Sequence, residues 1–269
     1  MPESSAWRFF DPDRGHREKH RGPQRNTGTT EDTEKTQRAT EKSGTTEDTE
    51  KTQRATERNT GTTEDTEKTQ RATDFIALEQ FKKISLAILA SGNGTNAEAI
   101  LKHFQNHERI SVALVLSNNP VAMVLERAGK FKVPIKVFSR LQFRVEVVSW
   151  LKEAGITHII LAGFLWLIPE SLIKAYPAKI INIHPSLLPR HGGKGMYGHA
   201  VHEAVKNSGD KETGITIHLV NERFDEGKII FQTSCPLNST DTPDSIAAKV
   251  HLLEHKHFSA VIEKWVLEG

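Results

Sequence analysis

Asn182 and His184 stand two residues apart in residues 182–189, which read NIHPSLLP. Apolar residues precede them, as at the end of a strand, and Pro185 biases His184 toward an extended backbone, so both side chains should point to one side. An Asn amide can donate to an oxygen that becomes negative in a tetrahedral intermediate, and a nearby His can carry a proton between an attacking amine and a leaving nitrogen. The pair predicts acyl transfer; the alternative is a strand-end His bonded to backbone.

Asp225 lies in residues 222–227, which read ERFDEG, between two strand-like segments. Gly227 is placed to make a turn, so a hairpin tip can carry Asp225 toward His184. A carboxylate that orients or charges an imidazole is the usual third member of such a site. The alternative is an ordinary acidic hairpin turn.

A glycine-containing loop follows the apolar run of residues 84–90 and precedes a helical pattern that continues through Phe104. Its two glycines can aim backbone N–H groups at one point near a helix N-terminus, where phosphate is the usual guest. The loop is not a P-loop, because no Gly-Lys-Ser/Thr follows, and Ala97 takes the third glycine position of a dinucleotide-binding loop. We expect a single phosphomonoester, with a plain strand-to-helix turn as the alternative. The loop consists of Ser91, Gly92, Asn93, Gly94, Thr95 and Asn96.

Strand-like and helix-like segments alternate through the rest of the chain. Further strands are expected at residues 110–116, 134–138, 156–161 and 179–183, and helices at 121–130, 143–153 and 169–175. This alternation predicts an α/β fold with a mostly parallel, twisted sheet and helices on both faces. Ligands gather at the carboxyl ends of such strands, where the glycine loop and His184 would lie. Residues 215–220 and 228–234 read as a hairpin at the sheet edge, and a helix from 241 to about 265 closes the chain.

The N-terminal part has a different composition. The sequence TTEDTEKTQRAT occurs at residues 29–40, 45–56 and 62–73. A solenoid needs apolar positions that bury against the next copy, and this unit offers only an alanine, so residues 1–81 are predicted to be a disordered tail before one domain at 82–269. The identical copies indicate a recent duplication. The segment is either an upstream extension from a wrongly chosen start codon or a genuine flexible tail.

Composition narrows the class of protein. The formal net charge of +2 argues against nucleic-acid binding through a broad basic face. The single cysteine, Cys235, excludes a disulfide scaffold and favours a reducing cytoplasm. The first residues lack the apolar core of a signal peptide, and the longest near-apolar run, residues 156–168, is too short to span a membrane. We therefore expect a cytoplasmic protein that binds neither membrane nor nucleic acid.

His251 and His255 stand four residues apart on the last predicted helix, with Glu254 beside them. This spacing can ligate a metal ion. However, no Glu follows the first His to complete a His-Glu-x-x-His motif, and no third ligand is evident. A solvated helix face is expected for the two histidines, and no metal is predicted.

Together these motifs resemble those of the phosphoribosylglycinamide formyltransferases, the folate-dependent enzymes of purine synthesis. The resemblance runs from about residue 83 to 265 and includes the glycine loop, residues 162–164 (AGF), residues 182–189 and residues 224–227. It implies a Rossmann-like single domain. It also implies a reaction in which the amine of glycinamide ribonucleotide attacks the formyl carbon of the co-substrate 10-formyltetrahydrofolate.

The resemblance also implies a role for each motif. Asn182 corresponds to the oxyanion donor, His184 to the proton-transfer group, and Asp225 to its partner, which acts with an ordered water. The residues implied to bind the ribonucleotide and its phosphate are Ser91, Gly92, Asn93, Gly94, Thr95, Asn96 and Glu254. Those implied to line the folate cleft are Leu165, Trp166, Leu167 and Ile168, together with Asn182.

The sequence departs from the family at two places. Many members have Arg where Trp166 stands, so a backbone contact to the pterin can survive here but a guanidinium contact from that position cannot. Residues 190–199 form a longer loop than in the bacterial prototype, and His199 is a candidate there for closing over the folate. His218 either supports the site or is a bonded core histidine.

Two other functions remain open at this stage. A methionyl-tRNA formyltransferase-like enzyme would share the Asn-x-His and Ser-Leu-Leu-Pro elements and the formyl donor, but it usually adds a C-terminal β-barrel, whereas this chain ends at Gly269. A non-catalytic folate- or nucleotide-binding module would not need Asn182, His184 and Asp225 together. The expected partners are therefore the two small-molecule substrates, bound by a monomer or homodimer.

Overall fold

The computed structural model describes residues 68, 70, 71 and 82–268. The predicted repeat tail therefore lies outside the described residues, except at 68, 70 and 71. Its disorder and the domain boundary at residue 82 stay predictions.

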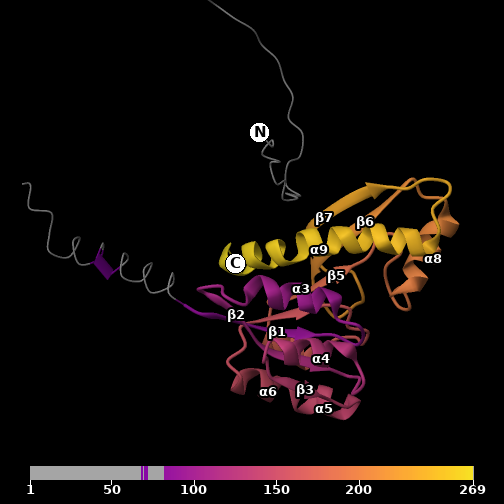
Figure 1. Cartoon of the computed structure of the whole chain (residues 1–269). Helices are drawn as coiled ribbons and strands as arrows, with labels where there is room; N and C mark the ends of the chain where they lie inside the picture. The colour runs from indigo at the N-terminus through magenta and orange to yellow at the C-terminus, as the bar shows by residue number, and fades with distance from the viewer. Residues whose placement is uncertain (1–67, 69, 72–81, 269) are drawn as a thin grey trace, which may run out of the picture. The chain divides into compact units, whose positions relative to one another are not determined.

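A seven-stranded sheet forms the centre of the described chain (Figure 1). Its strands lie in the order β3-β2-β1-β4-β5-β6-β7, and the first five run parallel while β6 and β7 run antiparallel to their neighbours. The mostly parallel sheet and the added edge hairpin are thereby confirmed. The strands are β1 (Ile84–Leu89), β2 (Ile110–Ser117), β3 (Ile135–Val137), β4 (His158–Leu161), β5 (Ile180–His184), β6 (Glu212–Leu219) and β7 (Ile229–Pro236).

Helices cover both faces of the sheet, as the alternating pattern predicts. In β1, Leu86 and Ile88 belong to one core while Ala87 and Leu89 belong to the other, because successive strand residues face opposite sides. The first core includes residues of α3 (Thr95–Phe104), α4 (Met123–Lys130), α8 (His199–Ser208) and α9 (Pro243–Glu268). The second includes residues of α5 (Arg140–Val145), α6 (Val147–Glu153) and α7 (Glu170–Ala175).

The predicted single helix at residues 143–153 is wrong. The chain forms α5 and α6 there, with Glu146 at the junction at φ −114°. The first of them begins earlier than predicted because Ser139 and Gln142 form a capping box, in which each side chain bonds the other residue's backbone N–H.

Helix α8 was not predicted, and it makes residue 199 the start of a helix rather than the end of a loop. It follows Gly198 without a side-chain cap and buries only Val201, His202 and Val205. The usual start signal and a long apolar stripe are therefore both missing from its sequence.

The site is positioned by three adjacent parallel strands. Leu89 of β1 pairs with Leu161 of β4, which in turn pairs with Asn182 of β5. The carboxyl ends of these strands therefore meet at one edge, and the glycine loop, residues 162–168 and His184 follow from that edge. Among the described residues, no helix combines the length and apolar composition needed to cross a membrane.

Candidate active site

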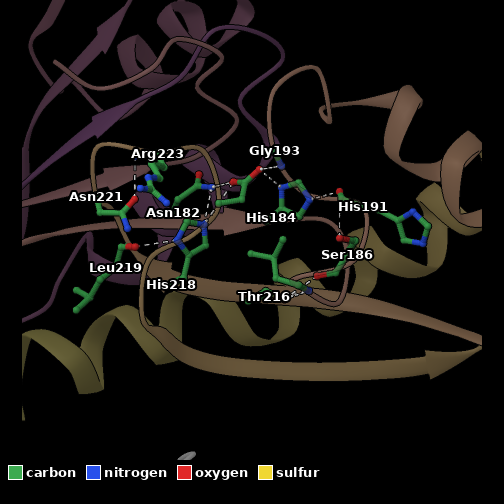
Figure 2. A network of polar contacts seen from close by, with 12 residues as sticks. Asn182, His184, Ser186, His191, Gly193, Thr216, His218, Leu219, Asn221 and Arg223 are labelled. Atoms are coloured by element: carbon green, nitrogen blue, oxygen red, sulfur yellow. Dashed lines mark hydrogen bonds and ion pairs between the residues drawn. The ribbon is translucent and has the colours of Figure 1, made fainter.

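Asn182, His184 and Asp225 come together at the carboxyl end of β5. The Asp225 carboxylate lies 3.5 Å from Nδ1 of His184 through Oδ2, and its Oδ1 lies 3.4 Å from Nδ2 of Asn182. Strand periodicity accounts for the shared direction of Asn182 and His184. The backbone N–H of Gly193 also donates to Oδ2 of Asp225 at 2.9 Å (Figure 2). The hairpin tip thus carries Asp225 to His184, at a residue with φ +58°.

Burial and charge have opposite effects on the two titratable groups of this pair. Burial lowers the pKa of His184, and the charge of Asp225 partly offsets this effect. Burial alone would raise the pKa of Asp225, but the charge of His184 and the hydrogen bond from the Gly193 N–H lower it. The pair is therefore a neutral imidazole facing a carboxylate near neutral pH, an arrangement suited to taking up a proton.

His218 supports the site from β6, opposite Asn182 in the sheet register. Its Nδ1–H donates to the carbonyl of Leu219 at 2.8 Å, which leaves Nε2 to accept from Nδ2 of Asn182 at 3.1 Å (Figure 2). Nε2 also lies 3.5 Å from Oδ1 of Asp225. The sequence left two alternatives open, and the structure shows a buried, bonded histidine whose bonds also reach the Asn182 amide.

The glycine loop uses its two glycines differently. Gly94 has φ +76°, and a Cβ there would lie 2.5 Å from Cβ of Val124, so only glycine fits against α4. Gly92 has no heavy atom within 4 Å of its Cβ position, so a side chain there would enter open space. Arg127 of α4 holds the loop by donating from Nε to the carbonyl and from Nη2 to Oδ1 of Asn93, both at 2.8 Å.

The last helix closes the loop from the other side. Glu254, buried on α9, accepts from Nδ2 of Asn96 at 2.9 Å and lies 2.9 Å from Nδ1 of His251. The His251 Nε2 lies 2.8 Å from Oγ1 of Thr95. The hydrogen bond that His251 donates to Glu254 raises the pKa of His251. Glu254 is therefore placed beside the loop.

The stretch predicted to line the folate cleft is divided by exposure. Leu165 and Leu167 are each 43% exposed, whereas Ile168 is buried in the core. Trp166 packs edge-on against Phe138, and the guanidinium of Arg140 lies 4.3 Å from the Trp166 ring centre. A cation therefore stands over the tryptophan, although position 166 itself carries none.

One cavity of about 1030 Å³ joins these parts. Its lining includes residues of the glycine loop, the stretch 161–168, the end of β5, the Asp225 hairpin tip, residues 193–199, and Glu254 with its neighbours on α9. His199 lines the cavity as well, but it pairs with Glu203 and Asp244 and is more than half exposed. All the residues predicted for catalysis, ribonucleotide binding and folate binding therefore line this cavity, except Ser91. The Oγ of Ser91 accepts from the N–H of Leu165 at 3.0 Å.

Sequence reasoning missed three residues of the site. Arg140 lines the cavity, and the capping box at Ser139 was a local signal that a helix begins there. Arg127 fixes the glycine loop, and only tertiary packing shows it. His202 of α8 lines the cavity, is 7% exposed, and within residues 82–268 has no partner for its Nδ1. Because α8 itself was not predicted, neither was its inward-facing histidine.

His251 and His255 lie with ring centres 4.7 Å apart, but His251 is engaged by Thr95 and Glu254. Within the part of the chain that the structure describes, no group of three or more His, Cys, Asp or Glu side chains is arranged to hold a metal ion.

Comparison with known proteins places the chain in a family. Residues 82–262 match the family described as formyl transferase. The chain is 38% identical over 185 residues to phosphoribosylglycinamide formyltransferase of Bacillus subtilis (strain 168), which covers 66% of this chain and 92% of that protein. It is 37% identical over 195 residues to the chloroplastic phosphoribosylglycinamide formyltransferase of Arabidopsis thaliana, which covers 67% of this chain and 65% of that longer protein.

A solved structure agrees with the sequence comparison. The crystal structure of phosphoribosylglycinamide formyltransferase from Bacillus halodurans matches with a TM-score of 0.62 and 35% sequence identity, covering 68% of this chain and 95% of that one. The chain therefore belongs to the formyl transferase family, among the phosphoribosylglycinamide formyltransferases.

Proposed function

We propose that this chain transfers the formyl group of 10-formyltetrahydrofolate to the amine of glycinamide ribonucleotide, giving formylglycinamide ribonucleotide and tetrahydrofolate in purine synthesis. The observation that carries the proposal is the single cavity lined by the glycine loop, by Asn182, His184 and Asp225, and by the apolar stretch 165–168. A phosphate at the loop and a pteridine at the apolar stretch would bring an amine and a formyl group together beside His184. The similar proteins of Bacillus subtilis and Arabidopsis thaliana are named phosphoribosylglycinamide formyltransferases, after this reaction.

The ribonucleotide phosphate would bind at the N-terminus of α3. Backbone N–H groups and the positive end of the helix dipole favour an anion there. The open space at the Cβ position of Gly92 allows close backbone approach. Glu254, which accepts a hydrogen bond from Asn96, would then lie near the sugar and amine end of the bound substrate. We assign Ser91 through Asn96 and Glu254 to this substrate.

The formyl folate would occupy the side of the cavity lined by the exposed Leu165 and Leu167, with Asn182 at its reacting end. Apolar side chains suit the pteridine and benzoyl rings, and Arg140 over Trp166 offers a cation to the carboxylates of the folate tail. Ile168 would act from the core by holding this stretch in place.

Attack of the amine on the formyl carbon sends the carbonyl electron pair to oxygen. We propose Asn182 as the donor to that oxyanion. Both hydrogens of its Nδ2 are engaged in the free enzyme, one by Nε2 of His218 at 3.1 Å and one by Oδ1 of Asp225 at 3.4 Å. The longer contact is the weaker, so the hydrogen facing Asp225 is the one that would turn to the substrate.

The attacking nitrogen must lose a proton, and the folate nitrogen must gain one when its bond to the formyl carbon breaks. We propose that Nδ1 of His184 takes up the first proton and returns it to the leaving nitrogen, directly or through a water. The negative charge of Asp225, 3.5 Å away, would stabilise the imidazolium between these two transfers.

All the residues assigned here lie within residues 82–269, so we propose that this segment is the formyltransferase domain. We further propose that it acts in the cytoplasm as a monomer or homodimer on small molecules only, without nucleic acid or a resident metal. A single half-buried cysteine and a near-balanced charge support a small-molecule enzyme of a reducing compartment.

The decisive experiment compares acceptors. The purified chain is incubated with 10-formyltetrahydrofolate and either glycinamide ribonucleotide or charged initiator methionyl-tRNA, and tetrahydrofolate formation is followed. Turnover with the ribonucleotide alone supports the proposal. Turnover with the tRNA alone would assign the chain to the methionyl-tRNA formyltransferases. Folate binding without turnover on either acceptor would indicate a binding module.

A further inference from the structure

The second nitrogen of His184 is held by a backbone carbonyl. Nε2 of His184 lies 2.8 Å from the carbonyl oxygen of His191 (Figure 2). A carbonyl oxygen can only accept, so Nε2 carries the hydrogen and, in the neutral ring, the lone pair is on Nδ1. Nδ1 is the nitrogen that faces Asp225. The His191 carbonyl therefore decides which nitrogen of His184 is the base.

The segment 191–193 contacts both members of the catalytic pair. At one end the His191 carbonyl accepts from His184, and at the other the Gly193 N–H donates to Oδ2 of Asp225 at 2.9 Å. Between them, a Cβ on Gly192 would lie 3.3 Å from Cβ of Asp225, so the backbone passes close against that residue. A displacement of this segment would move the His184 and Asp225 contacts together.

The conformation of this segment needs an anchor. His191 has φ +53°, in the left-handed region that a non-glycine residue adopts only when its surroundings hold it there. Its side chain supplies one hold, because Nε2 of His191 lies 2.8 Å from Oδ2 of Asp210, and the Ser186 hydroxyl supplies another by donating to the Arg190 carbonyl at 2.8 Å. The other oxygen of Asp210 accepts from Nη1 of Arg190, also at 2.8 Å.

Asp210 itself lies away from the chemistry. It follows Gly209, the C-cap of α8, and neither it nor His191 is among the residues that line the large cavity. Its side chain is 14% exposed and that of His191 is 16% exposed, so the bond between them is largely sheltered from water. The hydrogen bond from His191 is the main reason that the pKa of Asp210 lies below its ordinary value.

We propose that Asp210, acting through the His191 side chain, is a positioning residue that fixes the tautomer and orientation of His184. This inference rests on the proposed function, in which Nδ1 of His184 carries the proton. Asp210 touches no reacting atom in this scheme. It anchors residue 191, whose carbonyl holds the hydrogen on Nε2 and so keeps Nδ1 free.

The direct test is spectroscopic and does not require turnover. In ¹⁵N-labelled full-length protein, long-range ¹H–¹⁵N spectra of the imidazole rings distinguish the two tautomers, and a His184→Gln sample identifies the signals of His184. Wild type should show His184 with its hydrogen on Nε2. Asp210→Ala and the shape-conserving Asp210→Asn should both show loss of that single tautomer, whereas the neighbouring exposed Lys211→Gln should not change it.

Kinetics give the second readout. A misplaced proton carrier should lower kcat about 10-fold in Asp210→Asn while the KM of each substrate changes less than about two-fold. Because the carbonyl bond helps to raise the pKa of His184, the rising limb of the kcat–pH profile should move to lower pH. His191→Gln, whose amide can still donate to Asp210, should retain more activity than His191→Phe.

Different outcomes separate the possible failures. An unchanged Nε2–H tautomer in Asp210→Asn and Asp210→Ala would overturn the proposal, whatever their activity. A lower kcat together with a lower melting temperature but an unchanged His184 tautomer would also overturn the proposal, because Asp210 would then act on stability alone. If wild type transferred no formyl group, the proposed function would fail, and the spectra would still decide whether Asp210 sets the tautomer.

Discussion

Replacing Asp225 by Asn removes one charge from the centre of the site and nearly conserves its shape. Unit charges 3.5 Å apart, the distance from Oδ2 of Asp225 to Nδ1 of His184, attract by about 5 kcal/mol at an effective dielectric constant of about 20. Both charges are delocalised over two atoms, so we take about half of this figure as the loss felt by the imidazolium. That loss, about 2.5 kcal/mol, corresponds to a fall in kcat of roughly 70-fold, on the order of 10².

The same substitution predicts a change in pH dependence. Asp225 raises the pKa of His184 against the lowering effect of burial, so its removal should lower that pKa further. A proton carrier that must be neutral to accept a proton is active above its pKa. The rising limb of the kcat–pH profile should therefore move to lower pH in Asp225→Asn, and the plateau above it should fall about 10²-fold.

The assay is steady-state formyl transfer to glycinamide ribonucleotide, with the melting temperature measured in parallel. Asn at 225 leaves one donor among Gly193 and Asn182 without its acceptor, which should cost about 1–3 kcal/mol of stability. Glu226→Gln is the matched control, since Glu226 is exposed and forms an ion pair with Arg223, away from His184. It should leave kcat and the pH profile unchanged.

A double substitution tests whether the two residues act together. His184→Ala should lower kcat by a factor similar to that of Asp225→Asn, and the double variant should lose much less than the product of the two factors. Fully multiplicative losses, or near-normal kcat with an unshifted pH limb in Asp225→Asn, would refute the reasoning. Asp225 would then be an ordinary hairpin carboxylate.

Three further predictions concern the rest of the site. Gly92→Val should raise the KM for glycinamide ribonucleotide more than the KM for the folate, because the valine side chain would enter the open space at the loop. Gly94→Ala should mainly lower the melting temperature, because its Cβ would clash with α4. Equal effects of Gly92→Val on the two KM values would contradict the phosphate assignment. Arg140→Gln should raise the KM for formyl folate several-fold with an unchanged melting temperature, while Arg144→Gln on the same helix should change neither, and steady-state kinetics with each substrate varied will check this. Removing residues 1–80 should leave kcat and both KM values nearly unchanged, since every assigned residue follows residue 82. A large loss of activity in the truncated protein would contradict the proposed domain boundary.

The sequence by itself determined the local parts of the fold and site. The run of residues 84–90 before the glycine loop, and the alternation of apolar segments, follow from backbone rules that act within a few residues. Asn182 and His184 share a direction because side chains alternate along any strand. Where the local signal is weak, prediction from the sequence failed. Helix α8 lacks a polar cap and a long apolar stripe, so its start at residue 199 was not predicted.

Only the tertiary structure decided the distances on which the chemistry depends. Asp225 meets His184 from the tip of the β6–β7 hairpin, and Asp210 reaches the same histidine through His191 from the end of α8. The Arg140 guanidinium lies over Trp166 although the two residues are far apart in the chain. No local pattern encodes such contacts, because they depend on how helices and strands pack over long sequence separations, and the pKa values of His184 and Asp225 follow from that burial and those neighbours.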